Sequence, residues 1–422
     1  MSIKEIKSNS LSEKYYKIKH KSGLTIYVYE KQGYSSTYAI FGTKYGSINN
    51  KFKVDSGDVV SVPDGIAHYL EHKLFESEDG DAFSRYAKTG ANANAYTSFD
   101  KTCYLFSCTD NFKESFEILL DFVQSPYFTE ETVLKEQGII GQEIKMYDDS
   151  PGWRVLFNML MAMYKNHPVR IDIAGTVESI AKITPEYLYT CYNTYYNLNN
   201  MVLCVAGNTT VHEVLEVADK MLKESESHTI DNIFEDEPYE VTESYVEQCL
   251  PVGMPMFNLG FKERASQKRI DEKTLAYTDI LLFMLFSSTS TLYRKLMDEN
   301  LINSSFGYEV FEGEGFSATV LSGESHNPQM VEKVIKEYIS DLRANGIDKQ
   351  EFEIAKRATY GEAVASLNSV DHIANMITDF DFSQRELYSY IDAIANATIE
   401  DVENRFSQIL DINNTTLSVI KN

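Results

Sequence analysis

Two histidines and one glutamate near the N-terminus have the spacing of a metal site. His68, Glu71 and His72 form the pattern H-x-x-E-H within the segment GIAHYLEHKLF, residues 65–75. On a helix that advances about 100° per residue, these three side chains share one face with Phe75, and the opposite face carries Ile66, Leu70 and Leu74. Imidazoles at positions i and i+4 can bind one metal ion, and the carboxylate between them points into the same space. The spacing therefore predicts a zinc ion with a general base beside it.

A closed zinc site needs a further ligand on a second rigid element. The segment KEQGIIGQEIKMYDDSP, residues 135–151, offers Glu136 and Glu143. These two are about two helical turns apart, so both side chains point the same way. One could bind the metal and the other could support it, whereas a lone Glu on an acidic surface helix is more often solvated.

At this point the chain resembles a known family, the insulinase or pitrilysin type of inverzincin peptidases, which includes insulysin and the mitochondrial processing peptidases. The motifs that carry the resemblance are HYLEH, EQGIIGQE, GANANAYTSFDKTCYLF, NHPVRIDIAGTVESIAKITPEYL and NTYYNLNNMVLCVAGN. They cover nearly all of the first 210 residues, and the remainder is similar more weakly. The chain looks most like the short bacterial members, about half the length of insulysin.

The resemblance assigns roles to the residues of both motifs. It implies that His68, His72 and Glu143 are the zinc ligands, one zinc per chain, that Glu71 is the general base, and that Glu136 is a carboxylate that supports the ligands. It also implies two similar α+β domains, each an antiparallel-rich sheet backed by helices, which together form half of a clamshell chamber.

Composition indicates a globular protein of more than one domain. The chain has 422 residues, of which 43% are hydrophobic. We expect a cytoplasmic protein without a membrane span, because the sequence shows neither a signal peptide nor a run of eighteen apolar residues. Five cysteines without metal-binding spacing are expected to be reduced core residues. A net charge of -24 argues against nucleic-acid binding and would suit cationic peptides.

The chain looks like two distant repeats joined by an acidic linker. Residues 183–208 and 397–422 each read as a Thr cap, an amphipathic helix, an Asn-containing turn and an apolar strand. Amphipathic helices are expected at Asn111 to Val123 and Met330 to Leu342, and strands with one covered face at LTIYVYE and STYAIFG. We predict a zinc-binding domain at 1–225, a linker at 226–247 and a second, metal-free domain at 248–422.

The segment GANANAYTS, residues 90–98, suits an edge strand whose backbone stays open for pairing. The resemblance implies that substrate adds to this strand, with Asn92, Asn94 and Ala95 as binding residues and the scissile bond aligned beside zinc. An ordinary protected edge strand is the alternative.

The second half departs from the family pattern. Many members carry an Arg and, seven residues later, a Tyr that reach over the substrate. Tyr308 fits the Tyr and is predicted to be catalytic. Met297 occupies the position expected for the Arg, with a longer connection to the Tyr than the family has, and Arg294, one turn earlier, does not have the right spacing. No counterpart of the metal motif occurs in this half, whose equivalent helix near Thr274 to Phe286 is almost entirely apolar.

The sequence thus favours a zinc metallopeptidase that hydrolyses unfolded peptides, with Glu71 taking a proton from a water on the zinc. The alternative is a non-proteolytic assembly subunit that keeps the fold. The intact H-x-x-E-H favours the enzyme, and the missing Arg favours the subunit. The expected partner is a related zinc-less companion chain or, alternatively, a second copy of this chain.

Overall fold

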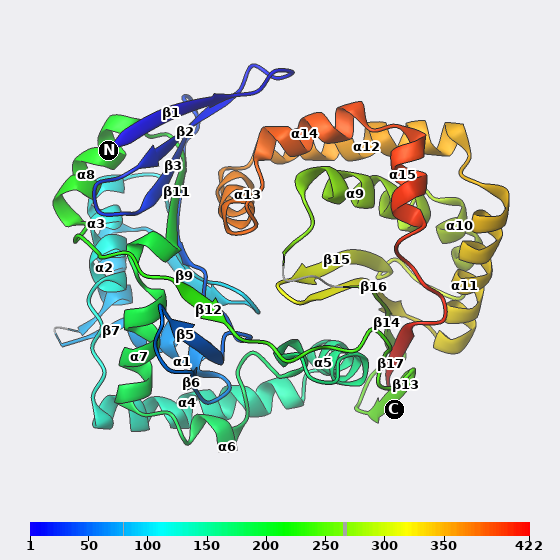
Figure 1. Ribbon diagram of the computed structural model, residues 1–422, viewed down its shortest axis with the longest axis horizontal. Helices are drawn as coiled ribbons and strands as arrows, with labels where there is room; N and C mark the ends of the chain where they lie inside the picture. Colours follow the sequence, from blue (N-terminus) through cyan, green and yellow to red (C-terminus); the bar gives the residue numbers. More distant parts are fainter. Residues whose placement is uncertain (79, 265–267) are drawn as a thin grey trace. The chain divides into compact units, whose positions relative to one another are not determined.

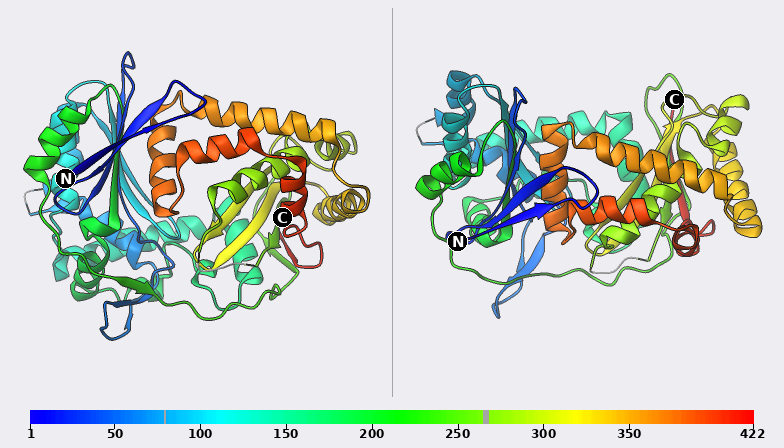
Figure 2. Two further views of the ribbon diagram at one scale, coloured as in Figure 1. Left: turned by 45° about the horizontal axis from the view of Figure 1, so that its top comes forward. Right: turned by 90° about the horizontal axis from the view of Figure 1, so that it is seen from above.

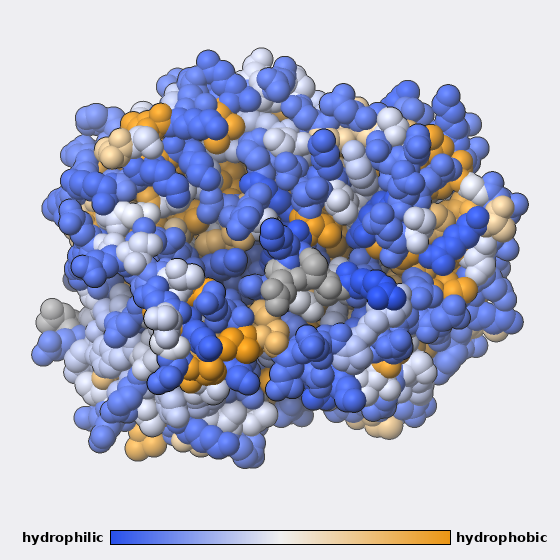
Figure 3. Space-filling view, viewed as in Figure 1, coloured by the Kyte–Doolittle hydropathy of each residue, from blue (hydrophilic) through white to orange (hydrophobic). Residues whose placement is uncertain are grey.

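The chain folds into two compact units, shown as a computed structural model in Figure 1, which describes residues 1–78, 80–264 and 268–422. Unit 1 comprises Met1–Ile144, Asp172–Ile233 and Ala365–Tyr388. Unit 2 comprises Lys145–Ile171, Phe234–Val364 and Ser389–Asn422. Polar side chains cover most of the face shown in Figure 3, as the acidic composition predicts.

Unit 1 is built on a seven-stranded sheet in which only β3 and β11 run parallel. Its strands, in spatial order, are β1 (Ser2–Lys7), β2 (Lys14–Lys19), β3 (Thr25–Glu30), β11 (Met201–Gly207), β4 (Thr37–Thr43), β10 (Thr102–Cys108) and β9 (Asn92–Thr97). Two small sheets accompany it, one of β12 (Ile230–Asn232), β5 (Lys51–Val54) and β6 (Val60–Ser61), the other of β7 (Glu76–Ser77) and β8 (Gly80–Asp81).

The helices of unit 1 cover both faces of the large sheet. They are α1 (Ile66–Leu74), α2 (Ala82–Thr89), α3 (Phe112–Val123), most of α4 (Glu130–Asp148), α6 (Val177–Ile180), α7 (Pro185–Tyr195), α8 (Val211–Met221) and α13 (Val370–Phe382), with a 3-10 turn at Leu198–Asn200. Helix α3 packs on β4 and β10, and α13 packs on β4 and β11, with the sheet between them (Figure 2). Strand β4 is consequently buried along its whole length.

Unit 2 repeats this plan on a five-stranded sheet in which only β13 and β17 run parallel. The spatial order is β13 (Tyr245–Cys249), β17 (Thr415–Lys421), β14 (Met256–Lys262), β16 (Phe316–Glu324) and β15 (Gly307–Gly313). The order and directions match β3, β11, β4, β10 and β9 of unit 1. The predicted α+β class with two similar domains is confirmed.

The helices of unit 2 include one from the first half of the sequence. They are α5 (Pro151–Met163), α9 (Glu272–Phe286), α10 (Thr291–Asp298), α11 (Pro328–Asn345), most of α12 (Lys349–Ser366), most of α14 (Leu387–Asn396) and α15 (Ile399–Phe406), with a 3-10 turn at Pro168–Arg170. Helix α5 packs on β14 and β17, as α13 packs on β4 and β11.

The units therefore differ from the continuous segments 1–225, 226–247 and 248–422. Each half of the sequence contributes one helix, α5 or α13, to the sheet of the other half. The expectation of strands covered on one face was wrong for β3 and β4, because the exchanged helix covers the second face. Part of the expected linker is also structured, since β12 pairs with β5.

The burial of the cysteines agrees with the sequence prediction for four of the five. Four cysteines are buried, but Cys249 is exposed because it ends the edge strand β13, so the prediction of core residues was wrong for it.

Residues Glu272–Asp298 are long and apolar enough to span a membrane, with 61% of the apolar window buried inside the structure. A buried core helix meets the same criteria, so this is weak evidence, and the absence of a membrane span stays a prediction.

The exchange of α13 gives a first test. Phe382 is almost completely buried at the end of α13. Its ring packs so closely on β4 that a Cβ added to Gly42 would lie 3.1 Å from the nearest ring carbon. Phe382→Ala should lower the free energy of unfolding by about 3 kcal/mol, because a cavity opens on the sheet. Urea denaturation measures this change, and an unaltered stability would contradict the packing of α13 on the seven-stranded sheet of unit 1.

Candidate active site

Helix α1 presents the H-x-x-E-H motif because a glycine starts it. Gly65 has a φ of 87°, in the left-handed region, and a Cβ there would lie 2.4 Å from the carbonyl oxygen of Ala174. Only glycine, which has no Cβ, avoids both the strain of a positive φ and the clash with the backbone of Ala174. Ile66, Leu70 and Leu74 are buried, as the helical pattern predicts, which fixes the rotation of the helix.

The structure brings His68, His72 and Glu143 together. Nε2 of His68 lies 3.7 Å from Oε1 of Glu143, and Nε2 of His72 lies 3.4 Å from Oε2 of the same carboxylate. One nitrogen or oxygen from each residue lies within 4.8 Å of the others. Helices α1 and α4 therefore place the three predicted ligands around one point.

The chemistry and spacing of these donors fit zinc. Ligands of a tetrahedral zinc, bound at about 2.0–2.1 Å, stand about 3.3–3.4 Å from one another. The two nitrogen–oxygen distances, 3.7 and 3.4 Å, are close to that value. Burial, together with the neighbouring His72, lowers the pKa of His68 to about 4, so this imidazole is neutral at pH 7, as metal binding requires.

Glu136 supports the second imidazole from the other side. Its Oε1 lies 3.0 Å from Nδ1 of His72, so the ring nitrogen that faces Glu143 is Nε2. Burial opposes protonation of His72, but its hydrogen bond with Glu136 and the charge of Glu143 outweigh burial and raise its pKa. A carboxylate on the second nitrogen fixes the orientation of a ligating imidazole.

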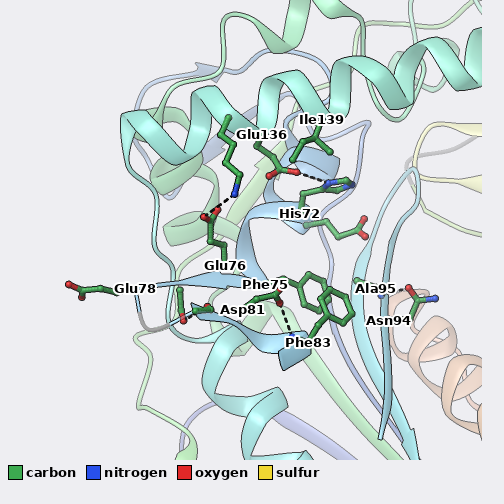
Figure 4. A pocket seen from close by; sticks show the side chains of 14 residues that line it. His72, Phe75, Glu76, Glu78, Asp81, Phe83, Asn94, Ala95, Glu136 and Ile139 are labelled. Carbon is green, nitrogen blue, oxygen red and sulfur yellow. Dashed lines mark hydrogen bonds and ion pairs between the residues drawn. The ribbon is translucent and has the colours of Figure 1, made fainter. Parts of the chain in front are cut away.

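Glu71 lines a pocket of about 540 Å³ beside these residues, together with His72, Glu136, Ala95 and the aromatic rings of Phe75 and Phe83 (Figure 4). The hydroxyl of Thr97 donates a hydrogen bond of 2.6 Å to Oε2 of Glu71. Burial raises the pKa of Glu71, and the hydrogen bond from Thr97 acts in the opposite direction. The carboxylate is thus held in one place with an increased affinity for a proton.

Strand β9 passes this pocket as the last strand of its sheet. Among the described residues it pairs only with β10. The amide N–H of Ala95 donates to the side-chain oxygen of Asn94, 2.9 Å away, so it points to the unpaired edge. Asn92 is exposed on the same strand. The geometry leaves backbone groups available beside Glu71, and the role of Asn92, Asn94 and Ala95 in substrate binding stays a prediction.

The residues predicted from the second half lie in unit 2. Tyr308 is in β15, where burial raises its pKa to about 12, so its phenol is protonated at neutral pH. Arg294 and Met297 lie on α10. These three residues belong to unit 2 and the metal ligands to unit 1, and the catalytic role of Tyr308 stays a prediction.

Thr97 is the site residue that sequence reasoning missed. In a strand, alternate side chains point to opposite faces, so Ala93, Ala95 and Thr97 share the face toward α1. The alternation that places Thr97 with Ala93 and Ala95 is visible in the sequence NANAYT. The sequence does not show which face of this strand packs against the H-x-x-E-H helix, so Thr97 could not be assigned to the site.

Comparison with known proteins agrees with this geometry. Residues 51–177 match the family model described as insulinase (peptidase family M16), and residues 182–359 match the one described as peptidase M16 inactive domain. A Bacillus subtilis protein named uncharacterized zinc protease YmfH is 40% identical over 417 residues, which are 95% of each chain.

Solved structures of the same fold exist. A protein described as an M16-like peptidase of Alicyclobacillus acidocaldarius has a TM-score of 0.94 and 34% identity, covering 98% of this chain and 99% of its own. Pitrilysin has a TM-score of 0.74 at 16% identity, which shows the fold alone, and the match covers 99% of this chain but 46% of pitrilysin.

Together these matches define the class, a protein with the zinc-protease fold and an intact set of metal-binding donors. The chain belongs to the M16 family, the insulinase or pitrilysin type, as a short bacterial member.

The geometry separates metal ligands from the base. His68→Ala and Glu143→Ala should lose both zinc and activity, because each removes a donor. Glu71→Gln should keep zinc and lower turnover by about three orders of magnitude or more, because it removes only the proton acceptor. Metal analysis of the purified variants measures this, and full zinc occupancy in Glu143→Ala would contradict the ligand assignment.

Thr97 gives an independent test of how Glu71 is held. Thr97→Val should lower kcat about tenfold with unchanged zinc content, because one orienting hydrogen bond is lost. Thr97→Ser keeps the hydroxyl and should retain most of the activity. Equal losses in the Val and Ser variants would show that the hydroxyl does not act on Glu71.

Proposed function

We propose that the protein is a zinc-dependent metallopeptidase that hydrolyses peptide bonds in unfolded peptides or protein segments. The observation that carries this proposal is the convergence of His68, His72 and Glu143 around one point, with Glu71 beside it at a pocket. One zinc per chain is proposed, because among the residues that the structure describes these form one such group.

His68, His72 and Glu143 would hold the zinc, which when bound lowers the pKa of a water molecule and polarises the scissile carbonyl. Glu71 takes a proton from the attacking water and passes it to the amine nitrogen as the C–N bond breaks. Thr97 keeps the carboxylate of Glu71 pointing toward the pocket, and Glu136 keeps the ring of His72 in its ligating orientation.

Substrate would lie along the open edge of β9 as an added strand. The N–H of Ala95, which now donates to Asn94, would donate instead to a substrate carbonyl. Because strand addition uses backbone groups, it suits unfolded segments, in which those groups are free.

A second candidate is a non-proteolytic or weakly active subunit of an assembly. The specific observations that favour it are Met297 at the position expected for the Arg and the match of residues 182–359 to a domain described as inactive. The complete donor set and the positioned Glu71 favour the enzyme.

We also propose that a second chain completes the active enzyme. The match to pitrilysin supports this, since it takes in 99% of this chain but only 46% of the longer protein. The companion would be a related zinc-less chain that supplies the missing Arg, with a homodimer as the alternative.

Cleavage of a mixed peptide pool tests the proposed function. The chain with its companion should cleave peptides, a chelator should abolish cleavage, and added zinc should restore it. The isolated chain should bind zinc but have a kcat/KM lower by about tenfold or more, because part of the transition-state stabilisation is missing. Native mass spectrometry establishes which species is present in each assay.

Three results would count against these proposals. Chelator-insensitive cleavage would contradict the zinc mechanism. The absence of cleavage in every assembly state would favour the subunit. Full activity of a monomer would contradict the need for a second chain.

A further inference from the structure

Strand β9 is attached to different helices on its two faces. Thr97 faces α1 and donates to Glu71. The neighbouring residue Tyr96 points to the opposite face, as alternation along a strand requires. Its hydroxyl donates a hydrogen bond of 3.1 Å to Oδ1 of Asn375 on α13. Figure 4 likewise shows Asn94, two residues before Tyr96, pointing away from His72.

Asn375 is held in place by contacts of its own. Its Nδ2 donates to the hydroxyl of Tyr38 on β4, 3.2 Å away, and to the backbone oxygen of Asp371, 2.9 Å away. Both amide donors and the oxygen are therefore used, so the amide has one orientation, with the oxygen toward Tyr96.

A second contact joins α13 to the end of the same hairpin. The ammonium of Lys101, in the turn between β9 and β10, forms an ion pair with Asp379. Asn375 and Asp379 are one helical turn apart, so they project from the same side of α13. The ion pair is partly exposed, with 42% of the Asp379 side chain accessible, and should contribute less than the Tyr96 hydrogen bond.

We propose that α13 positions the substrate-binding strand, with Asn375 and Asp379 as positioning residues for β9. The proposal rests on the proposed function, because it assumes that substrate pairs with β9. An edge strand has backbone hydrogen bonds on one side only, so side-chain contacts decide how firmly it is held. A firmly held β9 presents the N–H of Ala95 at a fixed distance from Glu71, which lowers the cost of ordering the strand when a peptide binds.

A helix from the second half of the sequence, α13, therefore helps to form the proposed peptide-binding site of unit 1. Asn375 and Asp379 touch neither the metal ligands nor the pocket. They act through Tyr96 and Lys101, the two ends of the six-residue segment 96–101. This segment contains Thr97, so the two contacts hold the end of β9 that lies beside Glu71.

The chain offers a matched control on the same helix. Asp381 accepts hydrogen bonds from Lys17 on β2 and Tyr27 on β3. These strands lie at the other end of the sheet order from β9. Asp381→Asn therefore weakens the attachment of α13 to a similar degree without loosening β9.

The experiment combines hydrogen exchange with peptide binding. The variants, made in the Glu71→Gln background, are Asn375→Ala, Tyr96→Phe and Asp379→Asn. A fluorescent unfolded peptide is titrated into the zinc-loaded protein with its companion.

We expect amide hydrogen exchange in residues 92–101 to become faster in these variants. The Kd of the peptide should rise about tenfold in Asn375→Ala and Tyr96→Phe, and less in Asp379→Asn. In the Glu71 protein, KM should rise while kcat changes less than about twofold. Asp381→Asn should alter neither exchange in 92–101 nor the Kd.

Zinc content and thermal unfolding of each variant show that it is folded and loaded. Unchanged exchange in residues 92–101 of a folded Asn375→Ala variant would overturn the proposal, as would a fall in kcat without a change in KM. An equal rise in Kd for Asp381→Asn would also overturn it, because the effect would then be one of general stability. If no variant, nor the Glu71→Gln protein itself, binds any peptide, the proposed function fails, whereas the exchange data still decide whether α13 holds β9.

Discussion

The approach of two imidazoles to one carboxylate, across the contact between α1 and α4, is the constraint on which the chemistry of this chain depends. Removed from their neighbours, His68, His72 and Glu143 would be ordinary polar residues of two helices. Within 4.8 Å of one another they form a site in which a neutral imidazole and a carboxylate face the same space. Burying such donors is unfavourable unless they are paired, which is the reason that metal binding and the local fold support each other.

Each of the two sheets is covered on one face by a helix from the other half of the sequence. Each sheet belongs to one half of the sequence, yet α5 and α13 each cover the sheet of the other half. Both sheets consequently gain a second covered face, and strands such as β4 can be buried along their whole length. The unit that holds the three metal-binding donors is therefore not a continuous stretch of sequence, and residues far beyond 225 contribute to it.

The metal site could be predicted from sequence because its parts obey local geometry. The spacing of His68 and His72, and that of Glu136 and Glu143, fixes which side of a helix each residue occupies, whatever the helix packs against. The apolar strands and the duplicated plan were predictable for the same reason.

What sequence reasoning missed depends on contacts between distant segments. Asn375 and Tyr96 are 279 residues apart, and no periodicity indicates that they meet. The exchange of α13 could not be foreseen because an amphipathic helix specifies that it must be buried, but not on which sheet. Thr97 was missed since its role depends on which face of β9 meets α1.

X-ray absorption at the zinc edge of the purified, zinc-loaded chain tests the metal centre most directly. Two imidazole nitrogens and carboxylate or water oxygens at about 2.0–2.2 Å, with no sulfur, are predicted. A sulfur ligand at about 2.3 Å, or a shell of six oxygens without imidazole, would contradict the assignment of His68, His72 and Glu143 as the ligands.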